Sequence, residues 1–139
     1  GKKGDLTGEE EISLSEIVKK ETGHDFVFVT DWPIENRPFY HMRYEDNPKL
    51  TKSFDLLYRG VEVTTGAQRE HRYDILVDQA KEKGMEVNTL EDYLNFFKYG
   101  CPPHGGVGIG PGRLVMKILD LSSVKEATFL PRDVKRLRP

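Results

Sequence analysis

The fold is decided by the stretch Ser53-Phe54-Asp55-Leu56-Leu57-Tyr58-Arg59-Gly60-Val61-Glu62-Val63-Thr64-Thr65. On both sides of Arg59-Gly60 the residues are largely aliphatic, aromatic or β-branched, a composition that is typical of strands. Two residues are the length of a tight hairpin turn. The stretch therefore predicts two antiparallel strands, over residues 53–58 and 61–65.

This hairpin carries two acidic residues that chemistry could use. With a two-residue turn, Asp55 lies opposite Thr64, so Asp55 and Glu62 become diagonal neighbours on one face of the sheet. Two carboxylates in such a position repel each other unless a cation or a basic side chain lies between them. Hard oxygen ligands that remain partly open to water and phosphate suit magnesium. The alternative is that Arg59 or another surface cation pairs with them.

A helix is expected after the second strand, with an arginine at the junction. Apolar residues recur at helical spacing from Tyr73, and Gly84 stands where that helix should end. Arg69 stands at the strand-to-helix junction, where it can point over the same sheet face as Glu62. This makes Arg69 a candidate clamp for a substrate carboxylate. A structural salt bridge to Glu70 or Asp74 is the competing interpretation.

A glycine-rich run follows a second predicted helix. That helix starts near Asn88 and carries an apolar stripe, expected to be buried against the sheet: Leu90, Tyr93, Leu94 and Phe97. In residues 104–112 nearly every second residue is glycine, so a backbone or a flat ligand can lie directly on the strand. Arg113 then opens a helix and offers a planar fork to phosphate oxygens. The alternative is a glycine strand that packs against its neighbours. Residues 124–130 are predicted to be extended.

The residues before the hairpin predict a helix and two strands. Residues 1–12 are expected to be flexible, and the capping-box spacing of Ser13 and Glu16 predicts a short helix that ends at Gly23. The apolar residues 26–29 predict a buried strand. After a loop that two prolines enforce, residues 39–44 are predicted to form another strand.

Composition limits the class of protein. The chain has 139 residues, which suits a single domain, and its net charge of −2 gives no global attraction to nucleic acid. Cys101 is the single cysteine, so no internal disulfide forms, as is usual for cytosolic proteins. No apolar run in the sequence is long enough to cross a membrane. A cytoplasmic location is therefore expected.

Several separated motifs follow one another along the chain. They are Arg37-Pro38-Phe39-Tyr40, Ser53-Phe54-Asp55-Leu56, Arg59-Gly60-Val61-Glu62, Gly66-Ala67-Gln68-Arg69, Pro102-Pro103-His104-Gly105-Gly106 and Phe129-Leu130-Pro131-Arg132-Asp133. In this order they resemble class II aspartyl-tRNA synthetases of the archaeal type. The likeness covers residues 26–139, and the glycine strand with Arg113 resembles motif 3 of that class. The resemblance implies an α+β fold, in which an antiparallel sheet is flanked by helices, within the C-terminal part of the catalytic domain.

The resemblance also implies roles for individual residues. The family forms aspartyl-adenylate from aspartate and ATP and then transfers the aspartyl group to tRNA. By analogy Glu62 binds magnesium and ATP, and Asp55 is a second acidic residue of the same metal site. Thr65 by analogy contacts both the metal and aspartate. Arg69 is similar to the arginine that holds aspartate. The ATP-binding segment is Gly110, Pro111, Gly112 and Arg113, with Arg113 on the terminal phosphate. The family likeness implies a homodimer for the parent protein.

Two departures from the family pattern leave alternatives open. Gly112 stands where the family has a larger residue, often glutamate, and the sequence has nothing similar to motif 1, motif 2 or the anticodon-binding barrel. The chain alone is therefore predicted to be inactive, as a fragment of a ligase or a truncated paralogue. One alternative is an asparagine synthetase paralogue that passes the same adenylate to ammonia. Another is a non-catalytic module with a synthetase-like fold.

Overall fold

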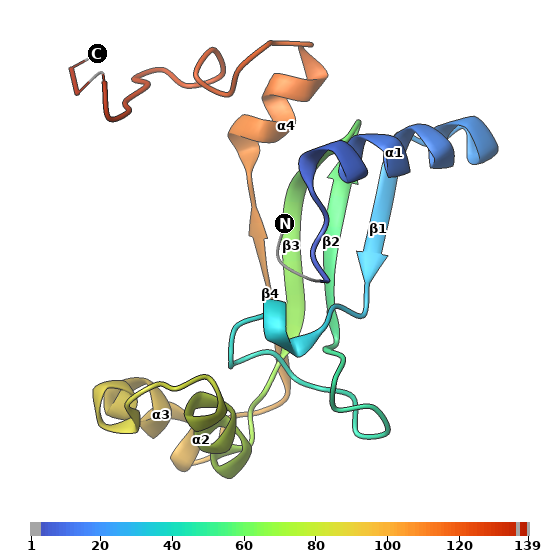
Figure 1. Cartoon of the computed structure of the whole chain (residues 1–139). Coiled ribbons are helices and arrows are strands. Elements are labelled where there is room, and N and C mark those ends of the chain that lie inside the picture. Colours follow the sequence, from blue (N-terminus) through green and yellow to red (C-terminus); the bar gives the residue numbers. More distant parts are fainter. Residues whose placement is uncertain (1–3, 136, 139) are drawn as a thin grey trace. The chain divides into compact units, whose positions relative to one another are not determined.

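A computed structural model describes residues 4–135, 137 and 138 of the chain. Its sheet has four strands in the order β1-β2-β3-β4, with helices before and after the strands (Figure 1). The elements are α1 (Gly8–Thr22), β1 (Phe26–Thr30), η1 (Ile34–Asn36), β2 (Ser53–Tyr58), β3 (Val61–Arg69), α2 (Tyr73–Glu82), η2 (Val87–Leu90), α3 (Glu91–Lys98), β4 (His104–Ile109) and α4 (Pro111–Ile118). The predicted α+β fold with an antiparallel sheet is confirmed.

The chain divides into two compact units, and the sheet strands contribute to both. The first unit comprises Gly1–Asp5, Val29–Phe54 and Gly66–Val107. The second comprises Leu6–Phe28, Asp55–Thr65 and Gly108–Pro139. Most residues of the predicted site therefore fall in the second unit, whereas Arg69 belongs to the first.

The hairpin between β2 and β3 forms as predicted, with a two-residue turn. Arg59 has a φ of 47° and Gly60 a φ of 79°. Positive φ at both central residues defines the turn type whose twist matches the flanking strands. A Cβ added at Gly60 would lie 2.9 Å from Cγ1 of Ile12 in α1, so this glycine also permits close approach of the helix. Strand β3 is longer than predicted, because it continues through Arg69.

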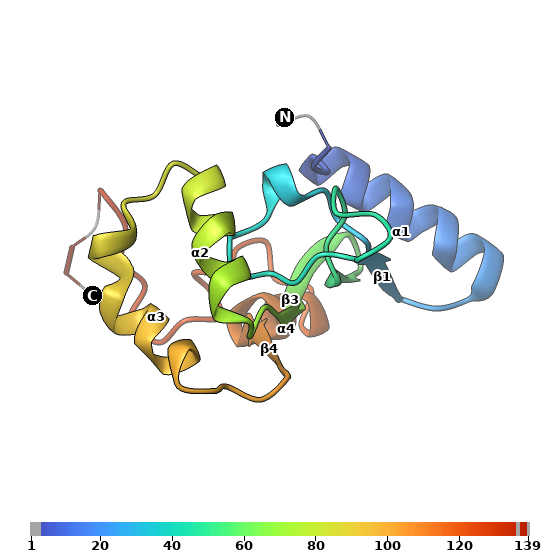
Figure 2. The same ribbon diagram turned by 90° about the horizontal axis from the view of Figure 1, so that it is seen from below.

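The first unit has its own small core, built by two helices. Figure 2 shows α2 and α3 side by side, and they contact each other and η2. The buried cluster consists of Phe39, Leu76, Ala80, Leu94 and Phe97. Leu94 and Phe97, in the apolar stripe of α3, are buried as predicted and belong to this cluster with residues of α2 and with Phe39. The Phe97 ring also stacks on His104 of β4, with ring centres 6.1 Å apart. Burial of the whole stripe against the sheet stays a prediction.

Helix α1 of the second unit begins earlier than predicted. Thr7 caps it, since its side chain accepts a hydrogen bond from the Glu10 N–H and Glu10 Oε2 accepts from the Thr7 N–H at 2.7 Å. The Ser13 hydroxyl instead donates to the Glu9 carbonyl at 2.9 Å, as it can inside a helix. Gly23 ends the helix at a φ of 79°, as expected. Residues 8–12 are thus helical, residues 1–3 lie outside the described part, and flexibility of 1–12 stays a prediction.

Three extended segments differ from prediction. Strand β1 was expected to be buried, but Phe26 is 50% and Phe28 63% exposed, because β1 is an edge strand of the sheet with only one covered face. Residues 39–44 form no strand and make only isolated bridges, such as the one between His41 and Arg69. Residues 124–130 are not extended. Short turns form there, in which the Ala127 N–H donates to the Val124 carbonyl at 3.2 Å.

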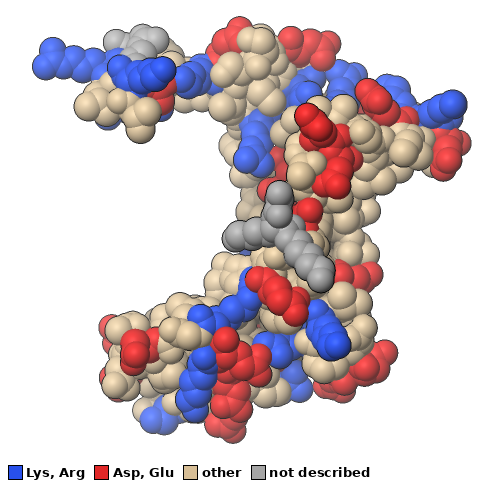
Figure 3. Space-filling model, in the orientation of Figure 1, with Lys and Arg blue, Asp and Glu red and all other residues tan. Residues whose placement is uncertain are grey.

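Surface charge is mixed. On the face shown in Figure 3, acidic and basic side chains are interspersed over each unit. Among residues 4–135, 137 and 138, no helix combines the length and apolar character needed to cross a membrane.

Candidate active site

In the second unit, β3 and the start of α4 bring Glu62 and Arg113 together. Arg113 Nη1 donates to the backbone carbonyl of Glu62 at 2.9 Å and lies 3.5 Å from its carboxylate Oε1. The Arg113 side chain is 52% exposed, which leaves part of its guanidinium open to solvent. Arg59 pairs with Asp25 and Asp120 instead. The alternative of a pairing cation therefore holds for Glu62, and the cation is Arg113.

A third acidic side chain, Glu11 of α1, joins this group. Burial raises the pKa of the Glu11 carboxyl, and the charges of Glu62 and Asp55 raise it further. A hydrogen bond from the Glu62 backbone N–H and the charge of Arg113 lower this pKa, but the net shift is upward. Glu11, Glu62 and Arg113 line an open pocket of about 400 Å³. Negative charge thus gathers in the second unit around Asp55 and Glu62. The positive charge of Arg113 compensates this negative charge only in part.

This acidic group fits a magnesium ion by its donor chemistry. Asp55 on β2 is 5% exposed, and Glu62 and Thr65 lie on β3 in the same unit. Within the described residues, no three histidine, cysteine or acidic side chains form a metal cluster by themselves. Magnesium does not require one, because it is usually bound through one or two carboxylates together with substrate phosphates and water. The observation in favour of a cation here is that Glu11 and Glu62 line the same pocket, where the charges of Glu62 and Asp55 add to burial in raising the pKa of Glu11.

The predicted ATP-binding segment forms the start of α4. The Gly110 N–H donates to the Val63 carbonyl at 2.8 Å, which ties the segment to β3, and Pro111 occupies the first helical turn. A Cβ added at Gly112 would lie 3.1 Å from Val124 Cγ2. A larger residue at this position would require Val124 to move, which gives a local steric reason for glycine where the family has a larger side chain.

In the first unit, the Arg69 side chain lies against an aromatic ring and a glycine. Its guanidinium carbon is 4.8 Å from the centre of the Tyr40 ring. Its Nη1 atom is buried and makes no hydrogen bond within the described part of the chain. The alternative of a salt bridge to Glu70 or Asp74 does not hold among the described residues, since the partner of Glu70 is Arg72. Arg69 thus keeps a buried donor unused, which is costly unless a ligand satisfies it.

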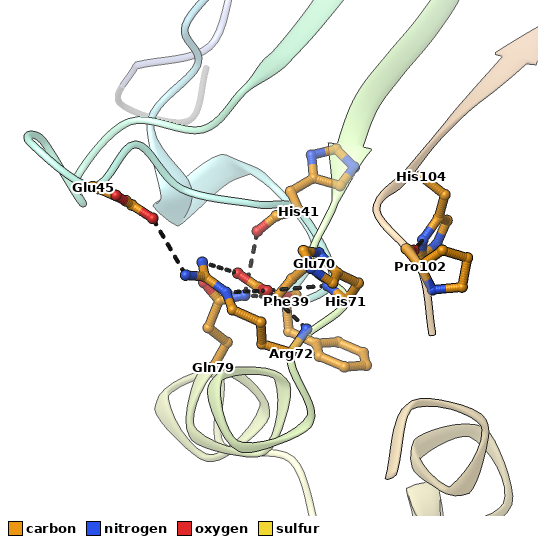
Figure 4. A network of polar contacts seen from close by, with 9 residues as sticks. All are labelled: Phe39, His41, Glu45, Glu70, His71, Arg72, Gln79, Pro102 and His104. Atoms are coloured by element: carbon orange, nitrogen blue, oxygen red, sulfur yellow. Dashed lines mark hydrogen bonds and ion pairs between the residues drawn. The ribbon is translucent and has the colours of Figure 1, made fainter. Parts of the chain in front are cut away.

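Glu70, next to Arg69, belongs to a polar network drawn in Figure 4. Its carboxylate accepts hydrogen bonds at 2.9 Å from Arg72 Nε and Nη2 and at 3.0 Å from the His71 and Arg72 backbone N–H groups. Although burial by itself raises the pKa of Glu70, these hydrogen bonds and the Arg72 charge bring that pKa below its ordinary value. Nearby, Gln79 Nε2 donates to the carbonyl of Phe39 at 2.5 Å. These contacts join α2 and Arg72, which precedes it, to Phe39 and Glu45 in the loop between β1 and β2, and they are structural.

Sequence reasoning assigned no role to two residues of these sites. Glu11 lies within residues 1–12, for which the sequence predicts flexibility, although the spacing of Thr7 and Glu10 indicates an earlier helix start. Tyr40 appeared only within a family motif. The structure places Asp55, Glu62, Thr65 and Arg113 in the second unit and Arg69 in the first. Convergence of all four charged groups over one sheet face stays a prediction.

Comparison with known proteins gives a consistent answer. The family of class II tRNA synthetases (D, K and N) matches residues 2–134. The aspartate–tRNA(Asp/Asn) ligase of Aeropyrum pernix is 48% identical over 97% of this chain and 30% of its own length. The aspartate–tRNA(Asp) ligase of Pyrococcus abyssi is 47% identical over 97% of this chain and 31% of its own length. The chain thus spans about 30% of the length of these curated relatives.

Solved structures agree with the sequence relatives. The aspartyl-tRNA synthetase of Entamoeba histolytica superposes on 100% of this chain and 29% of its own, with a TM-score of 0.95 and 39% identity. The asparaginyl-tRNA synthetase of Pyrococcus horikoshii covers 97% of this chain, and 31% of that chain is covered, with a TM-score of 0.88 and 35% identity.

Proposed function

The chain belongs to the class II tRNA synthetases (D, K and N), and we propose that it is the C-terminal part of the catalytic domain of an aspartate–tRNA ligase. Its close relatives carry that name at 44–50% identity. The observation that carries the proposal is Arg69, whose buried Nη1 lacks a hydrogen-bond partner among the described residues. A guanidinium in this state suits a carboxylate, which can accept two parallel hydrogen bonds.

In the proposed reaction, an aspartate carboxylate oxygen attacks the α-phosphorus of ATP and pyrophosphate leaves. A terminal hydroxyl of tRNA then attacks the carbonyl carbon of aspartyl-adenylate, and AMP leaves. Arg69 holds the aspartate, and Thr65 contributes its hydroxyl to aspartate and metal. These residues act by orienting the reactants, so that little entropy is lost in the chemical step.

The phosphates are assigned to the second unit. Arg113 binds the terminal phosphate with the part of its guanidinium that Glu62 leaves open, and Gly110, Pro111 and Gly112 form the backbone of the ATP segment. Asp55, Glu62 and Thr65 would hold magnesium. When bound, magnesium neutralises negative charge on the phosphates and on the crowded carboxylates.

The remaining partners follow from the same proposal. ATP, aspartate and tRNA are the substrates, the longer protein acts as a homodimer, and it works in the cytoplasm, where tRNA is charged. Relatives are named both for tRNA(Asp) alone and for tRNA(Asp/Asn), so both classes of tRNA are candidates for the second step.

The proposal is tested on the full-length protein by exchange of labelled pyrophosphate into ATP. We expect exchange that requires aspartate and magnesium, and transfer of labelled aspartate to tRNA. Arg43→Ala serves as a matched control for Arg69→Ala, since Arg43 pairs with Glu82 outside the proposed site. Exchange that is driven by asparagine and not by aspartate would overturn the proposal, as would the absence of any amino-acid-dependent exchange.

The asparagine synthetase alternative is not favoured, because the relatives at 44–50% identity are named tRNA ligases. The same assay separates the two activities. Formation of free asparagine from aspartate and ammonia, without aspartylation of tRNA, would favour the synthetase. Loss of both activities in the full-length protein would favour a non-catalytic module.

A further inference from the structure

We propose that Tyr40 and Gly106 are positioning residues, which together fix the plane of the Arg69 guanidinium for the substrate carboxylate. This inference rests on the proposed function, since it concerns the arginine assigned to aspartate. All three residues belong to the first unit. Tyr40 lies in the loop after β1, Gly106 lies on β4 and Arg69 lies at the end of β3.

The Tyr40 ring provides one support for the guanidinium. The 4.8 Å separation between the Arg69 guanidinium carbon and the ring centre is a cation–π distance. Backbone contacts set the two residues side by side. His41 bridges to Arg69, and the Glu70 N–H donates to the Tyr40 carbonyl at 2.9 Å. The register of the loop against β3 therefore places the ring at Arg69.

The ring itself is anchored in the core of the first unit. It makes an edge-to-face contact with the Phe39 ring, with centres 5.5 Å apart. Phe39 is 8% exposed and belongs to the buried cluster with Leu76 and Leu94. The support under Arg69 is thus rigid, because a core residue on the neighbouring position holds it in place.

Gly106 provides the second support by its missing side chain. A Cβ at this position would lie 2.9 Å from Nε of Arg69, closer than real Cβ atoms come to another heavy atom, and 3.0 Å from Nη2, which is tighter than most real Cβ contacts. The guanidinium therefore occupies space that only glycine leaves on β4. An alanine here would displace the flexible end of Arg69 and leave the backbone of the strand in place.

A fixed plane benefits substrate binding. A bidentate pair forms only when guanidinium and carboxylate are coplanar, and arginine that is already ordered loses less side-chain entropy on binding. The unsatisfied, buried Nη1 indicates that Arg69 is held in place without the help of a hydrogen bond at that atom. Ring contact and steric confinement supply the order in its place.

The test measures steady-state constants of the full-length protein in pyrophosphate exchange. For Tyr40→Leu and Gly106→Ala we expect the KM for aspartate to rise about tenfold, with the KM for ATP within about twofold of the parent value. Tyr40→Phe keeps the ring and should stay near the parent. Gly105→Ala is the control on the same strand, because its Cβ would meet the Ala67 carbonyl at 3.3 Å and not Arg69.

A double variant distinguishes positioning of Arg69 from general damage. When Tyr40→Leu is combined with Arg69→Ala, the ring should have no further effect on the KM for aspartate, because its target is gone. Additive effects of the two substitutions would overturn the inference, and so would equal changes in the two KM values. Thermal unfolding of each variant checks that it is folded, and Gly106→Ala keeps the test open if Tyr40→Leu is unstable.

The two proposals fail in different ways. If Arg69→Ala leaves aspartate use unchanged, the proposed function of Arg69 fails. If Arg69→Ala abolishes aspartate use while Tyr40→Leu and Gly106→Ala leave the KM for aspartate at the parent value, only the positioning inference fails.

Discussion

Arg69 and Glu70 are neighbours in the chain, yet they differ in how far the hydrogen-bonding groups of their side chains are satisfied. Glu70 is 1% exposed, and its carboxylate accepts from both the side chain and the backbone of Arg72 and from the backbone of His71. Arg69 is held by a ring and a glycine, while its buried Nη1 makes no hydrogen bond within the described residues. A satisfied buried charge stabilises a fold, whereas an unsatisfied donor is tolerated where a ligand will use it.

The largest expected effect separates function from stability at Arg69. In the full-length protein, Arg69→Ala should lower kcat/KM for aspartate, since a charge-assisted bidentate contact is lost. The corresponding activation free energy should rise by about 3 kcal/mol or more. Its melting temperature should fall little, because within the described part of the chain Arg69 Nη1 has no hydrogen-bond partner and the neighbouring Glu70 pairs with Arg72. Pyrophosphate exchange and thermal unfolding measure the two quantities. A large loss of stability with unchanged aspartate use would reverse the roles of the two neighbours.

Glu70→Ala should show the opposite pattern. Removing the carboxylate leaves the N–H groups of His71 and Arg72 without their acceptor, at a cost of about 3 kcal/mol in unfolding free energy. Urea unfolding of the full-length protein provides the measurement. Glu45→Ala is the control, because the Glu45 side chain at the other end of Arg72 is 84% exposed and such pairs contribute about 0.5 kcal/mol. Equal losses in the two variants would contradict a special role for Glu70.

Acid should weaken the same network in a defined direction. The folded-state pKa of Glu70 lies below its ordinary value of 4.5, so the folded state binds fewer protons there than the unfolded state. The stabilisation is therefore complete above pH 4.5 and is lost as the pH falls through the folded-state pKa. Glu70→Gln should lose less unfolding free energy than the parent protein over this interval. Identical pH profiles would rule out Glu70 as a source of the acid sensitivity.

The smallest effect is expected at Glu11, whose contribution to stability depends on pH in the opposite direction to that of Glu70. Its pKa is raised by burial and by Glu62, so its stabilising contribution is present below pH 4.5 and is lost as the pH rises through the folded-state pKa. At neutral pH Glu11→Gln should raise the unfolding free energy by a few tenths of a kcal/mol, since solvent screens much of the repulsion. Saturating magnesium should reduce this gain. A loss of stability at neutral pH would contradict the repulsion.

The sequence was a good guide where local chemistry is decisive. Arg59-Gly60 predicted the hairpin, because a turn of two residues is compatible with few backbone geometries, and Gly23 and Gly84 marked helix ends through their positive φ. Competing local signals misled it. Thr7 with Glu10 and Ser13 with Glu16 share the same spacing, and only the first pair forms the cap.

Tertiary contacts were beyond the reach of spacing rules. Arg69 has Glu70 beside it and Asp74 nearby, and nothing in the sequence reveals that Arg72 takes Glu70. The stripe on α3 predicted burial correctly for Leu94 and Phe97, but its partner, α2, depends on how the chain folds back. For the candidate site, the family motifs gave the residue types, while the Tyr40 ring under Arg69 became visible only in three dimensions.

Strand β1 has a practical consequence for work on the isolated chain. It lies at one end of the sheet order, and the rings of Phe26 and Phe28 are half or more exposed. Such an edge offers backbone hydrogen-bonding groups and apolar rings to any other copy that approaches it. Expressed by itself, the chain should therefore precipitate at high concentration, and a lysine in place of Phe28 should keep it in solution.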